Sequence, residues 1–458
     1  MSYDLVVIGG GPAGYVGAIR AAQLGKRVAC VEKDRAGGTC LNWGCIPTKS
    51  LLRNAELFHL MKHRADEFGF KFEKLDFDWS KVIQRSRNVA DKNAGGIEYL
   101  FKKNKVDYIR GEASLEKAGV VNVKGNDGKM QKLEAAKVLL CTGVVSRPMP
   151  NLPFNGKTVI GSREAMVLEK QPKSIVIIGA GAIGVEFAYF FNAFGTKVTI
   201  VEMMPNILPL EDTESSQTVE KAFAKLGIQV LTNTKVTGAE AGKEGVKILV
   251  EGKKKETIEA EICLVAIGVQ PLLPGGAAVD LTPRGYIQTG DRYQTSIPGV
   301  FAAGDIIGPP LLAHVASYEA VQAVEGMFTN HVPKLIGVFP SCTYCQPQVA
   351  SVGLTERAAK EKGLKYKIGK FPFSASGKAR AVGEVDGFVK MIFGEPHGEV
   401  LGAHIVGAEA TEMIGELGLA ITLEATHDDI EATIHAHPTL SEAVHEATGQ
   451  AFGEAIHI

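Results

Sequence analysis

The residues with the clearest chemical potential are two cysteines near the start of the chain. Cys40 and Cys45 lie in the run Gly37–Pro47, a Cys-x4-Cys spacing among glycines. Two thiols this close in sequence are suited to a reversible disulfide that carries an electron pair. In a regular helix, however, residues five apart have Cα atoms about 8.6 Å apart, beyond the roughly 7 Å that a disulfide tolerates. A bridge therefore requires that Cys40 precede the helix or that the first helical turn be distorted.

The residues around the cysteines favour such a distortion. Gly37, Gly38 and Gly44 supply flexibility, and Pro47 is tolerated in a first helical turn. A thiolate at a helix N-terminus is stabilised by the helix dipole, as a reactive cysteine requires. The alternatives are two buried free thiols or a zinc site, and zinc lacks a second ligand pair at matching spacing. No metal site is predicted.

Thiol–disulfide exchange at neutral pH also needs a base that removes a thiol proton. Histidine is the natural candidate, and His437 has Glu442 five residues later to orient its imidazole. In the alternative interpretation, Thr439 and Glu442 form a Thr-x-x-Glu helix capping box without catalytic role. A carboxylate has enough acceptor positions for both roles.

The elements that must position these residues include a motif that occurs twice. Near the N-terminus an apolar strand (3–8), a glycine-rich turn, a helix-like segment and a second strand (27–31) ending at Glu32 follow in that order. This order indicates a dinucleotide-binding unit, in which backbone amides approach a pyrophosphate and the acid binds ribose hydroxyls. The pattern recurs 170 residues later, with these identical pairs: Gly9 and Gly179, Gly11 and Gly181, Gly14 and Gly184, Gly25 and Gly195, Val28 and Val198, Val31 and Val201, Glu32 and Glu202. Two such sites in one chain predict two different dinucleotides.

Further strand-like runs complete these units and give the domain boundaries. Runs 138–143 and 262–268 each close one nucleotide domain, and a short strand before Asp305 presents its carboxylate to a polyol. Segments 113–135 and 228–262 are predicted as β-meanders. After residue 341 we expect a strand hairpin, 387–393 with 400–406, and helices from Thr411 and Asp428. The predicted fold is α/β, with Rossmann-like domains at 1–146 plus 275–340 and at 147–274, and a C-terminal α+β interface domain at 341–458.

Over essentially all 458 residues the sequence resembles the pyridine nucleotide-disulfide oxidoreductase family. Residues 38–49 and 435–442 are most similar to the members that oxidise dihydrolipoyl groups. The resemblance implies FAD in the first nucleotide domain, NAD in the second and a homodimer. It implies a disulfide on the flavin face opposite the nicotinamide, with Cys40 exchanging with the dithiol substrate and Cys45 in charge-transfer contact with the flavin. His437 would reach the disulfide of the other subunit.

The same resemblance implies the remaining cofactor contacts and the partners. Lys49 and Glu186 would pair near the flavin ring, Asp305 would bind the ribityl chain, and Ala313 and His314 would approach the flavin. The other implied cofactor-binding positions are Gly111, Thr142, Gly143 and Gly268. Lipoyl-bearing proteins of 2-oxo acid dehydrogenase or glycine cleavage complexes are the implied partners. The alternatives are another NAD(P)H-dependent disulfide reductase of the family and a non-catalytic flavoprotein subunit.

Two positions depart from the family pattern. Trp43 stands beside the cysteines where a smaller aliphatic residue is usual, and residues 268–271 lack the arginines often seen after that glycine. The residues that follow Glu202, Met203 to Asn206, carry no positive charge, which predicts NAD rather than NADP.

Composition limits the remaining possibilities. The formal net charge is -1 and no basic cluster is present, so neither nucleic acid nor a membrane surface is an expected partner. Seven cysteines in so long a chain argue for a reducing compartment. We expect a cytoplasmic, bacterial-type enzyme, with the mitochondrial matrix as the other possibility. Cys342 and Cys345 have Cys-x-x-Cys spacing but lie in a strand-like run where positions three apart face opposite sides, so no functional role is predicted for them.

Overall fold

The computed structural model describes residues 2–334 and 336–458, and its first sheet forms around the buried N-terminal strand. That strand pairs in parallel with strands on both sides, as a continuous apolar run without polar alternation requires. The sheet contains β1 (Ser2–Ile8), β2 (Val28–Glu32), β3 (Asp107–Lys117), β4 (Val120–Gly125), β5 (Met130–Leu140) and β16 (Val300–Ala302). β3 and β5 continue beyond the parallel part of the sheet and form the predicted antiparallel meander with β4. The accompanying helices are α1 (Pro12–Gln23), α2 (Gly38–Trp43), α3 (Cys45–His63), α4 (Trp79–Lys103) and α8 (Ala313–Phe328).

The second sheet is entirely parallel, in the order β10-β9-β8-β14-β7. Its strands are β7 (Val159–Ile160), β8 (Ser174–Ile178), β9 (Lys197–Val201), β10 (Gln229–Leu231) and β14 (Ile262–Val265), with helices α5 (Ser162–Ala165), α6 (Ala182–Ala193) and α7 (Thr213–Lys225). The predicted meander over 228–262 is shorter than expected, because β10 belongs to the parallel sheet. The antiparallel strands are β11 (Lys235–Ala241), β12 (Val246–Glu251) and β13 (Lys255–Ala260). A small two-stranded sheet, β6 (Val144–Ser146) with β15 (Val269–Pro271), lies where the chain passes between the nucleotide domains.

The C-terminal domain is a five-stranded antiparallel sheet with helices. The predicted hairpin is present as the adjacent strands β20 and β21, and the strand-like run around Cys342 forms β17, whereas β18 and β19 were not predicted. The strands are β17 (Pro340–Thr343), β18 (Gln348–Gly353), β19 (Tyr366–Pro372), β20 (Phe388–Gly394) and β21 (Val400–Gly407). The helices are α9 (Glu356–Glu361), α10 (Gly377–Val382), α11 (Ala410–Thr422), α12 (His427–Glu431) and α13 (Glu442–Phe452). The predicted helix starts at Thr411 and Asp428 are each one residue late.

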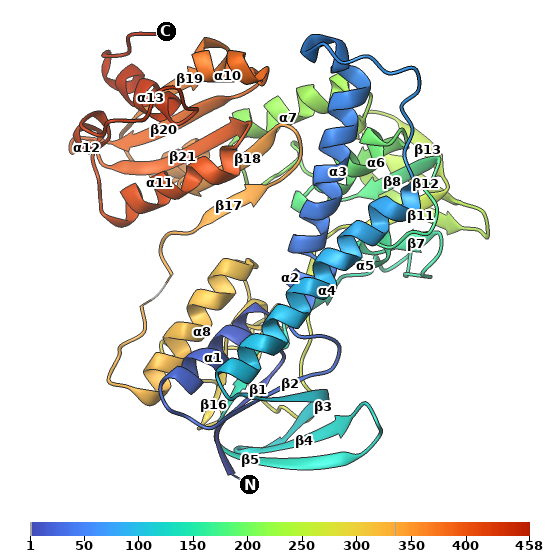
Figure 1. Cartoon of the computed structure of the whole chain (residues 1–458), viewed down its shortest axis with the longest axis vertical. Coiled ribbons are helices and arrows are strands. Elements are labelled where there is room, and N and C mark those ends of the chain that lie inside the picture. Colours follow the sequence, from blue (N-terminus) through green and yellow to red (C-terminus); the bar gives the residue numbers. More distant parts are fainter. Residues whose placement is uncertain (1, 335) are drawn as a thin grey trace.

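Helix α3, which begins at Cys45, connects the two nucleotide domains. Figure 1 shows α3 and α4 extending from the first sheet towards the second domain. Leu51 and Leu52 of α3 pack in the same buried cluster as Phe187 of α6. The residues at the start of α3 are therefore held between the domains. None of the helices in the described part of the chain combines the length and apolarity needed to cross a bilayer.

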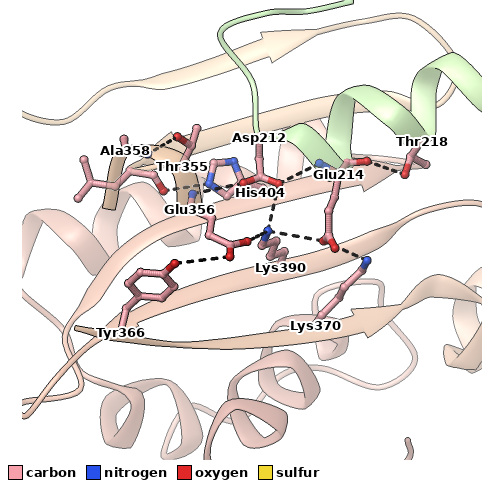
Figure 2. Close-up of polar contacts among 11 residues, drawn as sticks. Asp212, Glu214, Thr218, Thr355, Glu356, Ala358, Tyr366, Lys370, Lys390 and His404 are labelled. Atoms are coloured by element: carbon pink, nitrogen blue, oxygen red, sulfur yellow. Dashed lines mark hydrogen bonds and ion pairs between the residues drawn. The ribbon is translucent and has the colours of Figure 1, made fainter. Parts of the chain in front are cut away.

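A buried charge cluster joins the second domain to the C-terminal domain (Figure 2). Lys390 on β20 is 1% exposed, and its Nζ lies 3.1 Å from Asp212 Oδ1, 2.8 Å from Glu356 Oε2 and 3.6 Å from Glu214 Oε2. Asp212 also caps α7 by accepting a hydrogen bond from the Glu214 N–H. Burial alone would favour the neutral forms, but His404 and Lys390 hold the pKa of Asp212 below its usual range. The pKa of Lys390 is raised by its carboxylate partners despite burial.

We predict that Lys390→Met destabilises the protein by about 3 to 5 kcal/mol, because the buried Asp212 carboxylate loses its cation. Lys370→Met is the matched control. Lys370 is 41% exposed where it meets Glu214, so its loss should cost less than about 1 kcal/mol. Urea unfolding measures both. Because the pKa of Asp212 is lowered in the fold, its contribution is present above its ordinary pKa and fades on acidification. The loss of unfolding free energy caused by Lys390→Met should therefore become smaller at low pH. A loss equal to that of Lys370→Met would contradict the prediction.

Candidate active site

The two glycine-rich turns predicted from the sequence have the same backbone geometry. Gly9 and Gly179 have φ angles of 103° and 100°, and a Cβ on either would collide with a carbonyl oxygen of the neighbouring strand, at 2.3 and 2.5 Å. Helices α1 and α6 both begin without a side-chain cap, so their first N–H groups are available to a pyrophosphate. The repeat in sequence is thus a repeat in structure.

The acid that closes each fingerprint is held in the same way. Glu32 Oε2 accepts a 2.7 Å hydrogen bond from the Gly10 N–H, and Glu202 Oε2 accepts one of 2.7 Å from Ala180. The other oxygen of each carboxylate, Oε1, accepts a 2.8 Å hydrogen bond from the backbone N–H two positions later, which is that of Asp34 in the first copy and of Met204 in the second. Each carboxylate therefore faces its glycine turn with acceptor positions to spare for ribose hydroxyls.

Buried polar groups around the first turn fit a bound dinucleotide with a polyol chain. Thr142 Oγ1, just beyond β5, is buried and has no hydrogen-bond partner among the described residues. Burial raises the pKa of Asp305 to about 6. Burial likewise raises the pKa of Glu319 on α8 to about 7, and Glu319 Oε2 accepts a 2.7 Å hydrogen bond from Gly304 beside Asp305. Hydroxyl donors of a ligand would satisfy Thr142 and Asp305. Glu319, which orients the Asp305 turn, was not identified from the sequence.

The cysteine pair straddles a break between two helices. Cys40 lies in the short helix α2, Gly44 adopts φ −151° and ψ −118°, and Cys45 is the first residue of α3. Of the two arrangements that permit a bridge, the structure has the first: Cys40 precedes the helix that begins at Cys45, and Gly44 separates it from that helix. All seven cysteines are thiols, so the structure describes the reduced pair, and the disulfide of the resting enzyme stays a prediction. Gly38 packs against the phosphate turn: a Cβ there would lie 2.5 Å from Gly11 Cα.

The two thiols have different proton affinities. The Cys40 thiol hydrogen-bonds to the Cys45 sulfur and lowers the pKa of Cys45 to about 7, and the charge of Lys49 acts in the same direction. The pKa of Cys40 is raised by the same hydrogen bond and by burial. Cys45, at the N-terminus of α3, is therefore the more readily ionised thiol of the pair.

Lys49 and Glu186 form an ion pair beside the cysteines. Lys49 Nζ lies 2.8 and 2.9 Å from the two Glu186 carboxylate oxygens, and the Glu186 side chain is 7% exposed. Lys49 follows Cys45 by four residues on α3, so both side chains lie on one helix face. Glu186 opposes the effect of Lys49 by raising the pKa of Cys45. The pair thus adjusts the charge of the thiolate through a cation and an anion from different domains.

Trp43 is accommodated by two arginines and an aspartate. Its indole Nε1 donates to Asp34 Oδ2 at 2.9 Å, and Arg163 also reaches that oxygen at 2.9 Å. The guanidinium groups of Arg163 and Arg87 lie over the indole ring, 3.9 and 4.9 Å from its centroid. Arg87 Nη1 donates in addition to the Asn42 carbonyl at 2.8 Å. This cluster anchors the end of α2 and accounts for the departure from the family pattern.

His437 and Glu442 are paired, but far from the cysteines of their own chain. His437 Nδ1 lies 2.8 Å from Glu442 Oε1, and the His437 side chain is 82% exposed. Glu442 Oε2 accepts the Thr439 N–H at 2.8 Å, so one half of the capping box is present as well. The other half is absent, because Thr439 Oγ1 donates to the Ala436 carbonyl and α13 begins only at Glu442. Figure 1 shows α12 and α13 at one edge of the molecule, away from α2.

The remaining predicted positions are distributed along the rims of the nucleotide domains. Gly111 lies where β3 changes its partner from β2 to β4. Gly143 and Gly268 follow β5 and β14 with positive φ angles. Ala313 starts α8, and His314 Nε2 lies 2.9 Å from the Pro340 carbonyl. Arg147 lies beside the segment after Gly268, and its guanidinium donates to the Val269 carbonyl at 3.0 Å.

Known proteins resemble this chain over nearly its full length. A family model described as pyridine nucleotide-disulphide oxidoreductase matches residues 3–320, and the model of the dimerisation domain of that family matches residues 339–448. Dihydrolipoyl dehydrogenase of Chlorobaculum parvum is 46% identical over 97% of this chain and 96% of its own. Dihydrolipoyl dehydrogenase of Bacillus subtilis is 43% identical over 99% of both. Among solved structures, LpdA of Mycobacterium tuberculosis matches with a TM-score of 0.89 at 25% identity, over 97% of this chain and 98% of that one.

We predict that Lys49→Met raises the pKa of the Cys45 thiol by about one unit, because the nearby cation that favours the thiolate is lost. Glu186→Gln should lower the pKa, because it removes the opposing anion. The measurement is the pH dependence of iodoacetamide alkylation of the phosphine-reduced protein, with fragment spectra distinguishing Cys45 from Cys40. Shifts of the same sign in both variants would contradict this account.

Proposed function

The chain belongs to the pyridine nucleotide-disulphide oxidoreductase family, and we propose that within it the protein oxidises dihydrolipoyl groups to the cyclic disulfide with NAD⁺ as acceptor. The two glycine turns, Thr142 and Asp305 suit FAD and NAD as ligands. The observation that carries the proposal is the interrupted helix, which brings Cys40 against a Cys45 thiolate. An intact cysteine pair and a paired histidine argue against a non-catalytic subunit.

The geometry of His437 defines its part in the reaction. The Thr439 N–H and His437 hold the pKa of Glu442 below its usual range despite partial burial, so Glu442 is ionised and can only accept a hydrogen bond. Nδ1 of His437 must then carry the proton towards Glu442, which leaves Nε2 as the free base. We propose that Nε2 takes the first proton from the dihydrolipoyl substrate.

Exchange then proceeds between sulfur atoms. The substrate thiolate attacks Cys40 Sγ, the Cys40–Cys45 bond breaks, and its electron pair leaves on Cys45, whose lowered pKa makes it a good leaving group. The second substrate sulfur displaces Cys40 as a thiolate and closes the lipoyl ring, while the proton of that second substrate thiol passes to the Cys40 thiolate and converts it to a thiol. The product is the reduced pair, in which the Cys40 thiol hydrogen-bonds to Cys45 and favours ionisation of the Cys45 thiol. The chemistry that FAD supplies when bound is transfer of the electron pair onward to NAD⁺.

The separation of His437 from the cysteines supports a shared active site. We propose a homodimer in which the histidine of each subunit serves the disulfide of the other, and in which lipoyl-bearing proteins are the partners. The exposed side chain of His437 is accessible to a second subunit, and the dimerisation domain carries it. We further propose the domain boundaries near 147, 275 and 340 and a cytoplasmic location, the latter from the cysteine content.

Substrate and cofactor choice test the proposal directly. We predict that lipoamide, but not glutathione disulfide or trypanothione disulfide, is reduced efficiently, and that NADH exceeds NADPH by about a hundredfold or more. A 2′-phosphate would meet the Glu202 carboxylate, and Met203 to Asn206 offer no cation. Steady-state kcat/KM for each substrate with both nicotinamides measures this. Preference for glutathione disulfide with NADPH would favour the alternative reductase.

Complementation between two inactive chains tests the shared site. We predict that a mixed dimer of Cys45→Ser and His437→Ala subunits, each separately tagged, recovers about half the wild-type activity per dimer, because one of its two symmetric sites is intact. The two parent homodimers are the controls and should be inactive. A mixed dimer as inactive as its parents would show that His437 acts within its own chain or is not the base.

A further inference from the structure

The Lys49–Glu186 pair has a third contact that the sequence did not indicate, from the C-terminal domain. Tyr344 follows β17, and its backbone N–H donates a 3.0 Å hydrogen bond to Glu186 Oε1. Lys49 Nζ lies over the Tyr344 ring, 4.3 Å from its centroid. One residue thus contacts both the cation and the anion of the pair.

We propose that Tyr344 is a positioning residue that holds Lys49 beside Cys45. A lysine side chain is long and flexible, and that of Lys49 is 31% exposed, so one carboxylate leaves it free to swing towards solvent. The face of the aromatic ring attracts the ammonium and closes that path. The main-chain bond to Glu186 fixes the carboxylate at the same time.

The consequence for the reaction concerns the charge on Cys45. The groups that face Cys45 are Cys40 on α2, Lys49 on α3, Glu186 on α6 and Tyr344 beyond β17. Burial raises the pKa of Tyr344 to about 12, so its phenol is neutral at physiological pH. Only Lys49 supplies positive charge within this set, and its position therefore determines how far the thiolate is stabilised. The inference rests on the proposed role of Cys45 as the thiolate of the redox pair.

Substitution at Tyr344 separates the ring from the other contacts. Any residue except proline keeps the N–H bond to Glu186, so Tyr344→Leu removes only the side chain. Tyr344→Phe keeps the ring but loses the hydroxyl contact with Cys342. Tyr344→Met, which refills the space with a flexible apolar chain, is measured in parallel in case the leucine variant loses flavin. Tyr99→Leu, at a surface tyrosine 64% exposed on α4, is the matched control.

The experiment is the pH midpoint of Cys45 alkylation in the reduced holoenzyme, with flavin content and thermal midpoint recorded for each variant. Tyr344→Leu and Tyr344→Met should raise the midpoint by about half a pH unit, while Tyr344→Phe and Tyr99→Leu should match the wild type. In a Lys49→Met background Tyr344→Leu should cause no further shift, because the ring acts through Lys49.

Three results would overturn the inference. These are an unchanged midpoint in both ring-less variants, an equal shift in Tyr344→Phe, or a full additional shift in the Lys49→Met background. An equal shift in Tyr344→Phe would assign the effect to the Tyr344 hydroxyl and its contact with Cys342. The measurement needs no turnover, so failure of the proposed substrate in steady-state assays is distinguishable from failure of this inference.

Discussion

The ion pair between Lys49 and Glu186 is the interaction on which the arrangement of the active site depends, because it is where all three domains meet. Lys49 comes from the helix that begins with Cys45, Glu186 from α6 of the second nucleotide domain, and Tyr344 from the C-terminal domain. A carboxylate as buried as Glu186 is stable in its ionised form only with a cation nearby. Because the buried Glu186 carboxylate needs Lys49 as its partner, the packing of the domains also positions the positive charge that stabilises the Cys45 thiolate.

A second constraint couples the cofactor turn to the cysteines. Gly38 packs so closely on Gly11 that no side chain fits between them, and the Gly37 N–H donates to the Gly10 carbonyl at 2.8 Å. The turn suited to a pyrophosphate and the start of the cysteine helix are thus one packed unit. Trp43 and its arginines anchor the other end of that short helix. Because both ends of α2 are held, the distance between the sulfur atoms of Cys40 and Cys45 depends on the break at Gly44.

The C-terminal domain contributes to the chemistry at two separate places. Through Tyr344 and the buried Lys390 cluster it is attached to the second nucleotide domain of its own chain. Through His437 it presents a base at its far edge, exposed and already oriented by Glu442. One domain thereby stabilises the thiolate within its own subunit and, in the proposed dimer, supplies the proton acceptor to the neighbouring one.

The sequence by itself determined the features that local backbone demands impose. The glycine turns ending at Glu32 and Glu202 were predictable because a tight turn, a helix start and an acid follow at fixed spacings, and the structure repeats them almost identically. The cysteine spacing likewise implied that Cys40 precedes the helix or that its first turn is distorted. Only the tertiary structure decided that the break falls at Gly44, that Glu442 serves His437 and Thr439 together, and that Tyr344 reaches a site of another domain. Tyr344 lies 158 residues from Glu186 in the chain, and contacts at such separations arise from domain packing, which leaves no periodicity or spacing in the sequence.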